Sequence, residues 1–510
     1  MATVPQRQSE TLTMLLQASA QRTPDAPALT WKTARWSYGE LTGAAAATAA
    51  FLQGRGRSKG DHIALLFRNS PHYVAAYYGA LSAGCVTVPL NPHEHAQVLT
   101  RQMEHCQARM LLGDPAHPEW NAIAELAQAN GVEAIEIPSE DDAGTLGRYL
   151  RQMGGAAAAH HSAQEGDAIA TIIYTSGTTG RPKGVMLSHR NLAANTAAII
   201  EYLGLRSDDR GIAVLPFQFS YGNSVLHMHL AAGAELLLED SIAYPHAVLQ
   251  RMADSKVTGF SGVPSTFALL LSRCDLSAFD LSRLRYLTQA GGPMPRANIL
   301  RLKAQLPNAR LFVMYGQTEA SARLSYLPPD RLDDKLGSVG VAIPGVELAV
   351  LRPDGGMANP NEVGEIAAQG PNVMKGYLKD ADGTREALRG GWLHTGDLGH
   401  FDDDGFLYID GRAIEMIKVG AFRVSPQEIE EAIAALPGVA EVGVTGIPDE
   451  LLGQAIKAVL VMKVGAKLDV RTVKAHCRQH LAMYKVPKIV EFASTLPYTA
   501  TGKVRRLGLA

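Results

Sequence analysis

Cysteine is scarce in this sequence and is not arranged for metal binding or cross-linking. The 510 residues contain four cysteines, Cys85, Cys106, Cys274 and Cys477, which lie far apart and form no Cys-x-x-Cys pair. Neither a zinc site nor a disulfide framework is therefore indicated. We expect free, buried thiols in a protein of a reducing compartment.

An excess of charge and long apolar runs are missing as well. The formal net charge is −2, so no basic excess favours nucleic acid as a partner. The N-terminal segment MATVPQRQSETLTMLLQ lacks the apolar centre of a signal peptide. No uncharged apolar run approaches the length of a membrane span. We therefore expect a cytoplasmic protein without a transmembrane segment.

Short apolar, β-branched runs alternate with helical patterns along most of the chain. Such alternation predicts βαβ units and parallel sheets. The alanine-rich stretch 43–50 is typical of a helix, and the segment 154–166 of a surface connection. Strands are expected at 62–66, 85–89, 168–174, 211–215 and 311–315.

The pattern changes near 400–412, where the run FDDDGFLYIDGR predicts a turn region. Beyond it, Ser425 suits a helix N-cap, Pro426 the first helical position, and Glu428 the closing residue of a capping box. That helix is expected to end at Pro437-Gly438. Strands at 439–445 and 456–462 and a helix at 469–482 complete a small α+β domain on a hinge.

The strongest local feature is a loop rich in glycine and hydroxyl side chains. Glycines allow backbone N–H groups to turn toward an anion, hydroxyls add donors, and a lysine adds positive charge. These properties predict a polyphosphate site, although the spacing is not that of a Walker A loop. The loop follows the strand at 168–174, and a helix from Asn191 is expected after it. Its binding residues are Thr175, Ser176, Gly177, Thr178, Thr179 and Lys183.

The segment YTSGTTGRPKGV resembles the signature of the adenylate-forming superfamily, which includes acyl- and aryl-CoA synthetases, nonribosomal adenylation domains and luciferases. Further segments resemble its other motifs in the same order: LSAGCVTVPLNP, YGQTE, GWLHTGD, GR with KVGAFRVSP, and TATGK. The resemblance covers nearly the whole chain. It implies an α/β fold with a large domain of parallel and mixed sheets flanked by helices, residues 1–410, which includes a smaller β-rich subdomain. A mobile C-terminal α+β domain, residues 411–510, follows it.

The resemblance also implies a site for ATP and Mg²⁺. A carboxylate must attack the α-phosphate of ATP, so the site must supply positive charge and in-line positioning. Magnesium takes oxygen ligands, and a carboxylate can accept from two vicinal ribose hydroxyls. The implied metal ligands are Glu319 and Thr175, and the implied donor to the α-phosphate is Thr318. The implied ribose ligands are Asp397 and Arg412. The implied adenine site is formed by Tyr315, Gly316, Gly291, Gly292 and Pro293.

The C-terminal domain is implied to serve two steps. Lys503, in TATGK, would stabilise charge at the α-phosphate and the acid during adenylation. Rotation about the hinge would then bring Lys418, Gly420 and Arg423 to the site for the attack of coenzyme A, with Gly420 leaving room for the pantetheine arm. This sequence departs from many relatives at Ile414, Ala421 and Phe219, where they carry Asp or Lys, Gly, and His.

The implied acid pocket lies between 217–226, 288–293 and 313–317, and includes Tyr221, Asn223 and three glycines. No carboxylate precedes Ser220 to hold an ammonium group, which favours a fatty or aryl acid over an α-amino acid. The sequence leaves two other functions open: an adenylating enzyme that loads an acyl carrier protein or forms an amide, and an inactive nucleotide sensor. It also leaves open an oxidative luciferase-type activity and whether the chain forms a homodimer.

Overall fold

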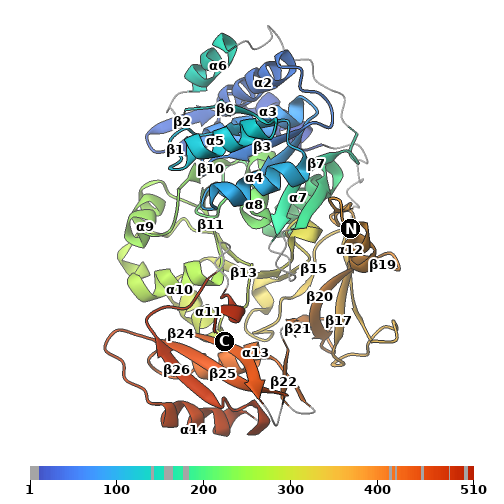
Figure 1. Ribbon diagram of the computed structural model, residues 1–510. Coiled ribbons are helices and arrows are strands. Elements are labelled where there is room, and N and C mark those ends of the chain that lie inside the picture. Colours follow the sequence, from blue (N-terminus) through green and yellow to red (C-terminus); the bar gives the residue numbers. More distant parts are fainter. Residues whose placement is uncertain are drawn as a thin grey trace.

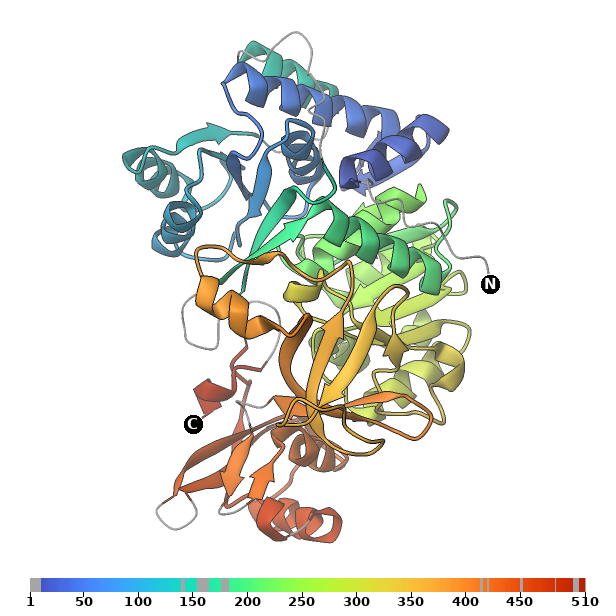
Figure 2. The same ribbon diagram turned by 90° about the vertical axis from the view of Figure 1, so that its right-hand side faces the viewer.

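The computed structural model describes residues 11–138, 143–153, 165–175, 183–412, 416–419, 422–449, 453–481, 483–498 and 504–509. Two large α/β sheets form the N-terminal part, a smaller β-rich unit lies beside them, and a compact α+β unit lies at the far end (Figures 1 and 2). This arrangement confirms the predicted fold class.

The first large sheet has seven strands in the order β18-β8-β7-β4-β3-β5-β6. The strands from β7 to β6 run parallel, whereas β8 and β18 form an antiparallel edge. The predicted strands at 62–66, 85–89 and 168–174 are confirmed. The strands are β3 (His62–Leu66), β4 (Val86–Pro89), β5 (Met110–Gly113), β6 (Glu133–Glu136), β7 (Ile169–Thr175), β8 (Lys183–Ser188) and β18 (Gly376–Tyr377).

The second large sheet has nine strands in the order β15-β14-β13-β12-β11-β9-β10-β1-β2. Its six central strands, β13 to β1, run parallel, and antiparallel strands close both edges. The strands are β1 (Pro27–Trp31), β2 (Ala34–Ser37), β9 (Arg210–Ala213), β10 (Glu235–Leu238), β11 (Gly259–Gly262), β12 (Tyr286–Gln289), β13 (Arg310–Tyr315), β14 (Ser325–Leu327) and β15 (Val341–Ala342).

Helices cover these sheets, and several of them begin at local capping signals. Ser37 forms a capping box with Glu40, and Ser188 forms one with Asn191. The helices of this part are α1 (Leu12–Arg22), α2 (Tyr38–Gly54), α3 (Pro71–Ser82), α4 (Ala96–Cys106), α5 (Trp120–Ala129), α6 (Ala143–Gln152), α7 (His189–Leu203), α8 (Ser220–Ala232), α9 (Pro245–Asp254), α10 (Pro264–Arg273) and α11 (Arg296–Gln305). No helix in the described part of the chain is long and apolar enough to cross a membrane.

The β-rich unit is a five-stranded sheet in which β20 pairs with both β17 and β21. Its elements are β16 (Glu347–Leu351), β17 (Gly364–Gln369), α12 (Ala381–Ala387), β19 (Leu388–Arg389), β20 (Trp392–Phe401) and β21 (Leu407–Arg412). The predicted turn region at 401–412 is only partly a turn, because 407–412 form β21. Gly411 and Arg412 therefore belong to this sheet, and the domain boundary at 410/411 stays a prediction.

The C-terminal unit has a separate hydrophobic core, which includes Ile429, Ile433, Val444 and Leu460. The two predicted strands are confirmed in longer form, and the predicted helix at 469–482 is α14. Its elements are β22 (Ile417–Val419), β23 (Phe422–Val424), α13 (Pro426–Ala434), β24 (Val439–Asp449), β25 (Gly453–Met462), α14 (Val470–His480) and β26 (Ile489–Ala493). Short 3₁₀ turns lie at Leu276–Ala278, Thr318–Ala320, Pro329–Arg331, Met483–Lys485 and Arg506–Leu509.

Two local predictions are wrong. The capping box at Ser425 does not form: Ser425 is the N-cap, but its hydroxyl has no hydrogen-bond partner among the described residues. Glu428 instead accepts from Lys485 Nζ at 2.5 and 2.6 Å, because the tertiary ion pair competes with the local bond. The glycine-rich loop is followed by strand β8 rather than directly by a helix, and that helix begins at His189 rather than Asn191.

The four cysteines are free thiols. Three are buried and Cys274 is half-buried, so the prediction of free, buried thiols holds fully for three. Burial raises the pKa of Cys85 to about 12 and that of Cys106 to about 11. These two thiols therefore stay protonated and serve as packing groups.

Candidate active site

The glycine-rich loop connects the antiparallel strands β7 and β8. Thr175, at the end of β7, is paired in register with Lys183, at the start of β8. Ser176, Gly177, Thr178 and Thr179 lie outside the described residues, and their roles stay predictions. The hairpin places Thr175 and Lys183 side by side at the mouth of the loop.

Lys183 belongs to a small cluster of charged and aromatic groups. Its Nζ lies 4.5 Å from the centre of the Tyr377 ring and 3.7 Å from Asp380 Oδ2. The Tyr377 hydroxyl donates to Glu319 Oε1 at 2.9 Å. Burial, and then the charge of Glu319, raise the pKa of Tyr377 well above its usual value. Tyr377 therefore keeps its proton and orients the Glu319 carboxylate.

Tyr377 was missed by the sequence analysis. It reaches Glu319 because β18 pairs with β8 at the edge of the sheet, and because Met374 N donates to Glu319 O at 2.8 Å. The two residues are 58 positions apart in the sequence. No local pattern around Tyr377 signals this contact.

Glu319 is the only predicted metal ligand with a carboxylate, and the surroundings fit one Mg²⁺ shared with a nucleotide. Among the described residues, no group of three His, Cys, Asp or Glu side chains could hold a metal ion alone. Magnesium is commonly held by one or two carboxylates together with substrate phosphates and water. The half-buried Glu319 can supply such a ligand beside the Lys183 ammonium.

On the other side of the loop 315–319, Tyr315 contacts the predicted ribose ligand. The Tyr315 hydroxyl donates to Asp397 Oδ2 at 2.7 Å, and Asp397 is buried. Arg412 lies opposite Asp397 in the β20–β21 ladder, and its side chain lies outside what the structure describes. Asp397 and Arg412 are therefore brought to one place by strand register, across 15 residues of sequence.

Gly316 is required by close packing. A Cβ at this position would lie 2.1 Å from the Ala322 carbonyl oxygen, which is backbone and cannot rotate away. Gly291 has a φ of +91°, and Gln289 Nε2 donates to Gly292 O at 2.8 Å. These glycines, with the exposed Pro293, follow β12, while 316–319 follow β13. Ligands of parallel α/β sheets commonly bind at such carboxyl ends of strands.

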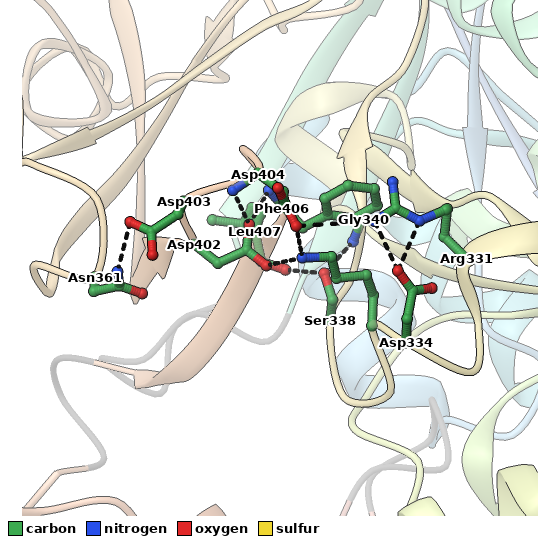
Figure 3. A network of polar contacts seen from close by, with 11 residues as sticks. Arg331, Asp334, Ser338, Gly340, Asn361, Asp402, Asp403, Asp404, Phe406 and Leu407 are labelled. Atoms are coloured by element: carbon green, nitrogen blue, oxygen red, sulfur yellow. Dashed lines mark hydrogen bonds and ion pairs between the residues drawn. The ribbon is translucent and has the colours of Figure 1, made fainter.

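The hairpin that carries Asp397 and Arg412 is fixed by a polar network, and Figure 3 labels Asp402, Asp404 and Phe406 of it. Lys335 Nζ donates to Asp402 Oδ2 at 2.8 Å and also to Asp404. Asp402 Oδ1 in turn accepts from the Phe406 backbone at 2.8 Å. These bonds close the turn between β20 and β21.

The implied acid pocket lies beside helix α8. Its 217–226 segment is only partly a loop, because the helix begins at Ser220. Ser220 Oγ lies 3.1 Å from Thr318 Oγ1, and the Tyr221 hydroxyl lies 2.9 Å from both oxygens of Thr288. Asn223 Oδ1 contacts His227 Nε2 at 2.8 Å. Polar groups thus line this region more densely than the sequence indicated.

The predicted residues of the C-terminal unit are mostly outside this description. Lys503, Gly420, Ala421 and Ile414 lie outside the described residues, and only the backbone of Lys418 and Arg423 is described, in β22 and β23. An Arg296–Glu431 ion pair of 4.0 Å joins the two parts of the chain. A cavity of about 950 Å³ between them is lined by residues such as Arg296, Asp410 and Glu428, and, among the side chains that the structure describes, by none of the predicted nucleotide ligands.

Comparison with known protein families assigns the chain to one of them. Residues 16–378 match the family described as AMP-binding enzyme, and residues 428–503 match the AMP-binding enzyme C-terminal domain. The chain belongs to the AMP-binding enzymes, which confirms the resemblance to the adenylate-forming superfamily.

Relatives with assigned names define the class further. The chain is 32% identical to a long-chain-fatty-acid–CoA ligase of Bacillus subtilis (strain 168), covering 98% of this chain and 94% of that protein. It is 34% identical to a feruloyl-CoA synthase of Amycolatopsis sp., covering 95% of each. It is an AMP-forming acid–thiol ligase of the acyl-CoA synthetase type, as predicted.

A solved structure agrees over the whole length. The o-succinylbenzoate CoA synthetase of Bacillus subtilis, in complex with an acyl-adenylate intermediate, has a TM-score of 0.85 at 29% identity and covers 98% of each chain. The same enzyme with ATP and magnesium ion has a TM-score of 0.84 at 30% identity, covering 97% of this chain and 98% of that one. These complexes support the predicted use of ATP and Mg²⁺.

Proposed function

We propose that this ligase activates a fatty or aryl acid with ATP and transfers the acyl group to coenzyme A, releasing pyrophosphate and AMP. The observation that carries the proposal is the loop 315–319, which contacts Asp397 at one end and the Tyr377–Lys183 cluster at the other. One loop thus connects a ribose ligand with a phosphate and metal ligand.

In the first step, an oxygen of the acid forms a bond to the α-phosphorus of ATP, and the bond from that phosphorus to pyrophosphate breaks. Glu319 would hold Mg²⁺, which would supply positive charge to neutralise the phosphates. Lys183 and the Thr318 hydroxyl bind phosphate oxygens, while Tyr315 and Asp397 hold the nucleoside in line. Lys503 adds positive charge from the C-terminal unit, so that two anions can meet.

In the second step, the thiol of coenzyme A loses its proton to water, and its sulfur attacks the acyl carbon. The bond from that carbon to AMP breaks, and AMP leaves with the electron pair. No cysteine of the chain takes part. Lys418 and Gly420, on the far side of the hinge, form the thiol entrance once the C-terminal unit has rotated.

The acid has no α-ammonium group. The residues before Ser220 are Phe217, Gln218 and Phe219, and the Gln218 amide donates to Asn91 Oδ1 at 3.3 Å. An ammonium would therefore meet no negative charge from this segment, and burying it unpaired is costly. We expect medium- or long-chain fatty acids or aryl acids to be used.

The test is pyrophosphate release with a panel of acids, followed by mass analysis with coenzyme A, a holo carrier protein or an amine as acceptor. We expect release with fatty or aryl acids and an acyl-CoA product. Robust exchange with any common amino acid would refute the proposed acid class. Exclusive acylation of the carrier protein would assign the chain to carrier loading, and ATP binding without AMP release would indicate a sensor.

A further inference from the structure

Arg323 is the most deeply buried cation of this region and has no charged partner among the residues that the structure describes. Its exposed fraction is 1%, and it is among the largest fully buried side chains of the described protein. Within the described residues, no carboxylate forms an ion pair with Arg323, and its Nε has no hydrogen-bond acceptor. Its one direct hydrogen bond to the backbone runs from Nη1 to the adjacent Ala322 carbonyl at 3.3 Å.

Other buried or half-buried cations of the same sheet are paired. Arg285 Nη2 lies 2.7 Å from Asp209, and Arg210 Nε lies 2.6 Å from Glu235. Each of these carboxylates is less than one-tenth exposed. Among the described residues, Arg323 therefore differs from these two arginines in lacking a carboxylate partner, and an unpaired buried charge is strongly unfavourable.

Arg323 lies beside the implied acid pocket, so a substrate bound in that pocket could supply the missing anion. Its guanidinium lies 4.2 Å from the centre of the Tyr221 ring, a residue of the implied pocket. Tyr202 is a second aromatic neighbour of Arg323. Burial raises the pKa of Tyr202 to about 12, and the charge of Arg323 and its hydrogen bond to Tyr202 oppose that rise. Its backbone packs on Gly316, whose added Cβ would lie 2.7 Å from Arg323 Cα.

The interior beside Ser321 has both polar and apolar walls. A small gap beside α8 is lined by Ser220, Asn223, Asn195 and Ser321, and also by Ile173, Leu187 and Leu192, and it is too small to hold a water molecule. Asn223 Nδ2 and Asn195 Oδ1 are buried and have no hydrogen-bond partner in the described part of the protein. Buried polar atoms normally find partners, so these two atoms are exceptions to the usual pairing.

We propose that Arg323 binds a second carboxylate at the remote end of the acid, so that this ligase prefers dicarboxylic acids over monocarboxylic acids of the same length. Arginine presents a fork of N–H donors that matches a carboxylate with two parallel bonds. The aromatic rings of Tyr221 and Tyr202 exclude water from that pair. The inference rests on the proposed function and narrows its acid class to fatty or aryl acids with a distal carboxylate.

The experiment compares ATP–pyrophosphate exchange with matched acids: hexanedioate and hexanoate, octanedioate and octanoate, and benzene-1,4-dicarboxylate and benzoate. Wild-type protein is expected to favour at least one dicarboxylate by about 100-fold in kcat/KM, because its site would otherwise hold an unpaired charge. Arg323→Met should abolish that preference, mainly through KM, and should keep or increase activity with the monocarboxylate. Arg310→Met, an exposed arginine at the start of β13, should leave the preference unchanged.

Several outcomes would overturn the inference. One is a wild-type enzyme that uses every monocarboxylate as well as its matched dicarboxylate. Another is an Arg323→Met variant that loses activity equally with both classes and melts well below wild type, which would mark a structural arginine. We expect instead an unliganded melting temperature equal to or above wild type, because the variant removes a buried charge.

Failure of the proposed function would look different. A folded protein that exchanges pyrophosphate with no acid would refute the ligase activity itself. In that case, a dicarboxylate at saturating concentration should still raise the melting temperature of wild type and not of Arg323→Met. Equal or absent shifts in the two proteins would overturn the Arg323 site.

Discussion

Glu319 illustrates how single contacts organise this site. Its carboxylate accepts from the Tyr377 hydroxyl, and Tyr377 also contacts the Lys183 ammonium through its ring. One negative and one positive group are thus held on the same aromatic side chain. The arrangement suits a metal and a phosphate that approach together.

Replacement of Glu319 by Gln tests its proposed role. The amide keeps the shape and can still accept from Tyr377, but it removes the negative charge that Mg²⁺ requires. We expect adenylate formation to fall by about 100-fold or more, with a higher Mg²⁺ concentration for half-maximal rate. Pyrophosphate exchange measured over a Mg²⁺ series gives both quantities. Tyr377→Phe, which retains the carboxylate, should lose much less activity, and an unchanged Mg²⁺ dependence in Glu319→Gln would contradict the assignment.

The sequence identified Glu319, Asp397 and Lys183 from their motifs, but not the residues that position them. Tyr377 and Arg323 lie outside those motifs, and their roles depend on strand pairing and burial. Burial of a cation cannot be read from a local pattern, because the same arginine would be ordinary on a surface. Residue types at a site were therefore predictable, and their partners were not.

At the scale of elements, the hairpin β20–β21 positions the proposed ribose ligands. Asp397 and Arg412 are opposite each other only if the turn at 402–405 holds the register. Hydrogen bonds to Asp402 and then to Asp404 raise the pKa of Lys335, so the ammonium stays charged at this turn.

Replacement of Lys335 by Met should loosen this turn. We expect a melting temperature lower by a few degrees and a higher KM for ATP, because Asp397 and Arg412 lose their fixed register. Differential scanning fluorimetry and steady-state kinetics measure the two effects. Lys303→Met, which breaks an exposed pair with Asp333, serves as the matched control and should change neither quantity. An unchanged KM in Lys335→Met would contradict this role of the network.

Elements with clear periodicity and caps were predicted well, and short edge elements were not. The predicted strand at 311–315 is present, whereas β8 was missed because it begins inside the glycine-rich motif. The capping box at Ser425 satisfied every local requirement and still failed, because Lys485 binds Glu428. Local signals fix where α13 begins, and tertiary charge decides which side chains bond.

At the scale of the whole molecule, motif order was enough to predict two parts and their fold. The position of one part relative to the other was not predictable, because the motifs describe both steps of the reaction. The Arg296–Glu431 pair and the cavity beside it lie between the parts. The proposed mechanism requires this interface to open and re-form between the two steps.

The role of Lys503 belongs to this scale, since it couples the C-terminal unit to the first step. Lys503→Ala should reduce adenylate formation by about 100-fold or more while transfer from a supplied acyl-adenylate to coenzyme A stays largely intact. Pyrophosphate exchange and acyl-CoA formation measure the two half-reactions separately. Lys463→Ala, an exposed lysine of the same unit, is the control. Exchange at the wild-type rate in Lys503→Ala would reject the role.

Buried histidines make the stability of the fold depend on pH. Burial lowers the pKa of His227 to about 3 and that of His189 to about 4, whereas an unfolded histidine titrates near about 6.5. His227 is neutral, with Tyr78 donating to Nδ1 and Nε2 donating to Asn223. Their stabilisation is fully present above pH 6.5 and is lost as the pH falls, because the unfolded chain then binds more protons.

We expect the free energy of unfolding to fall by up to about 1.4 kcal/mol per pH unit for each of these histidines below pH 6.5. Urea titrations at pH 7.5, 6.5 and 5.5 measure this slope. His227→Gln should reduce the slope, and His93→Gln, at an exposed histidine, should not. A stability independent of pH over this range would contradict the burial of both imidazoles as neutral groups.

The most direct test of the account follows the oxygen atoms. An accepted acid labelled with ¹⁸O in its carboxylate is incubated with ATP, Mg²⁺ and coenzyme A, and the AMP is examined by mass spectrometry. Attack of the carboxylate on the α-phosphorus predicts AMP that carries one ¹⁸O, together with unlabelled pyrophosphate. Unlabelled AMP, or label in inorganic phosphate or pyrophosphate, would contradict an acyl-adenylate intermediate.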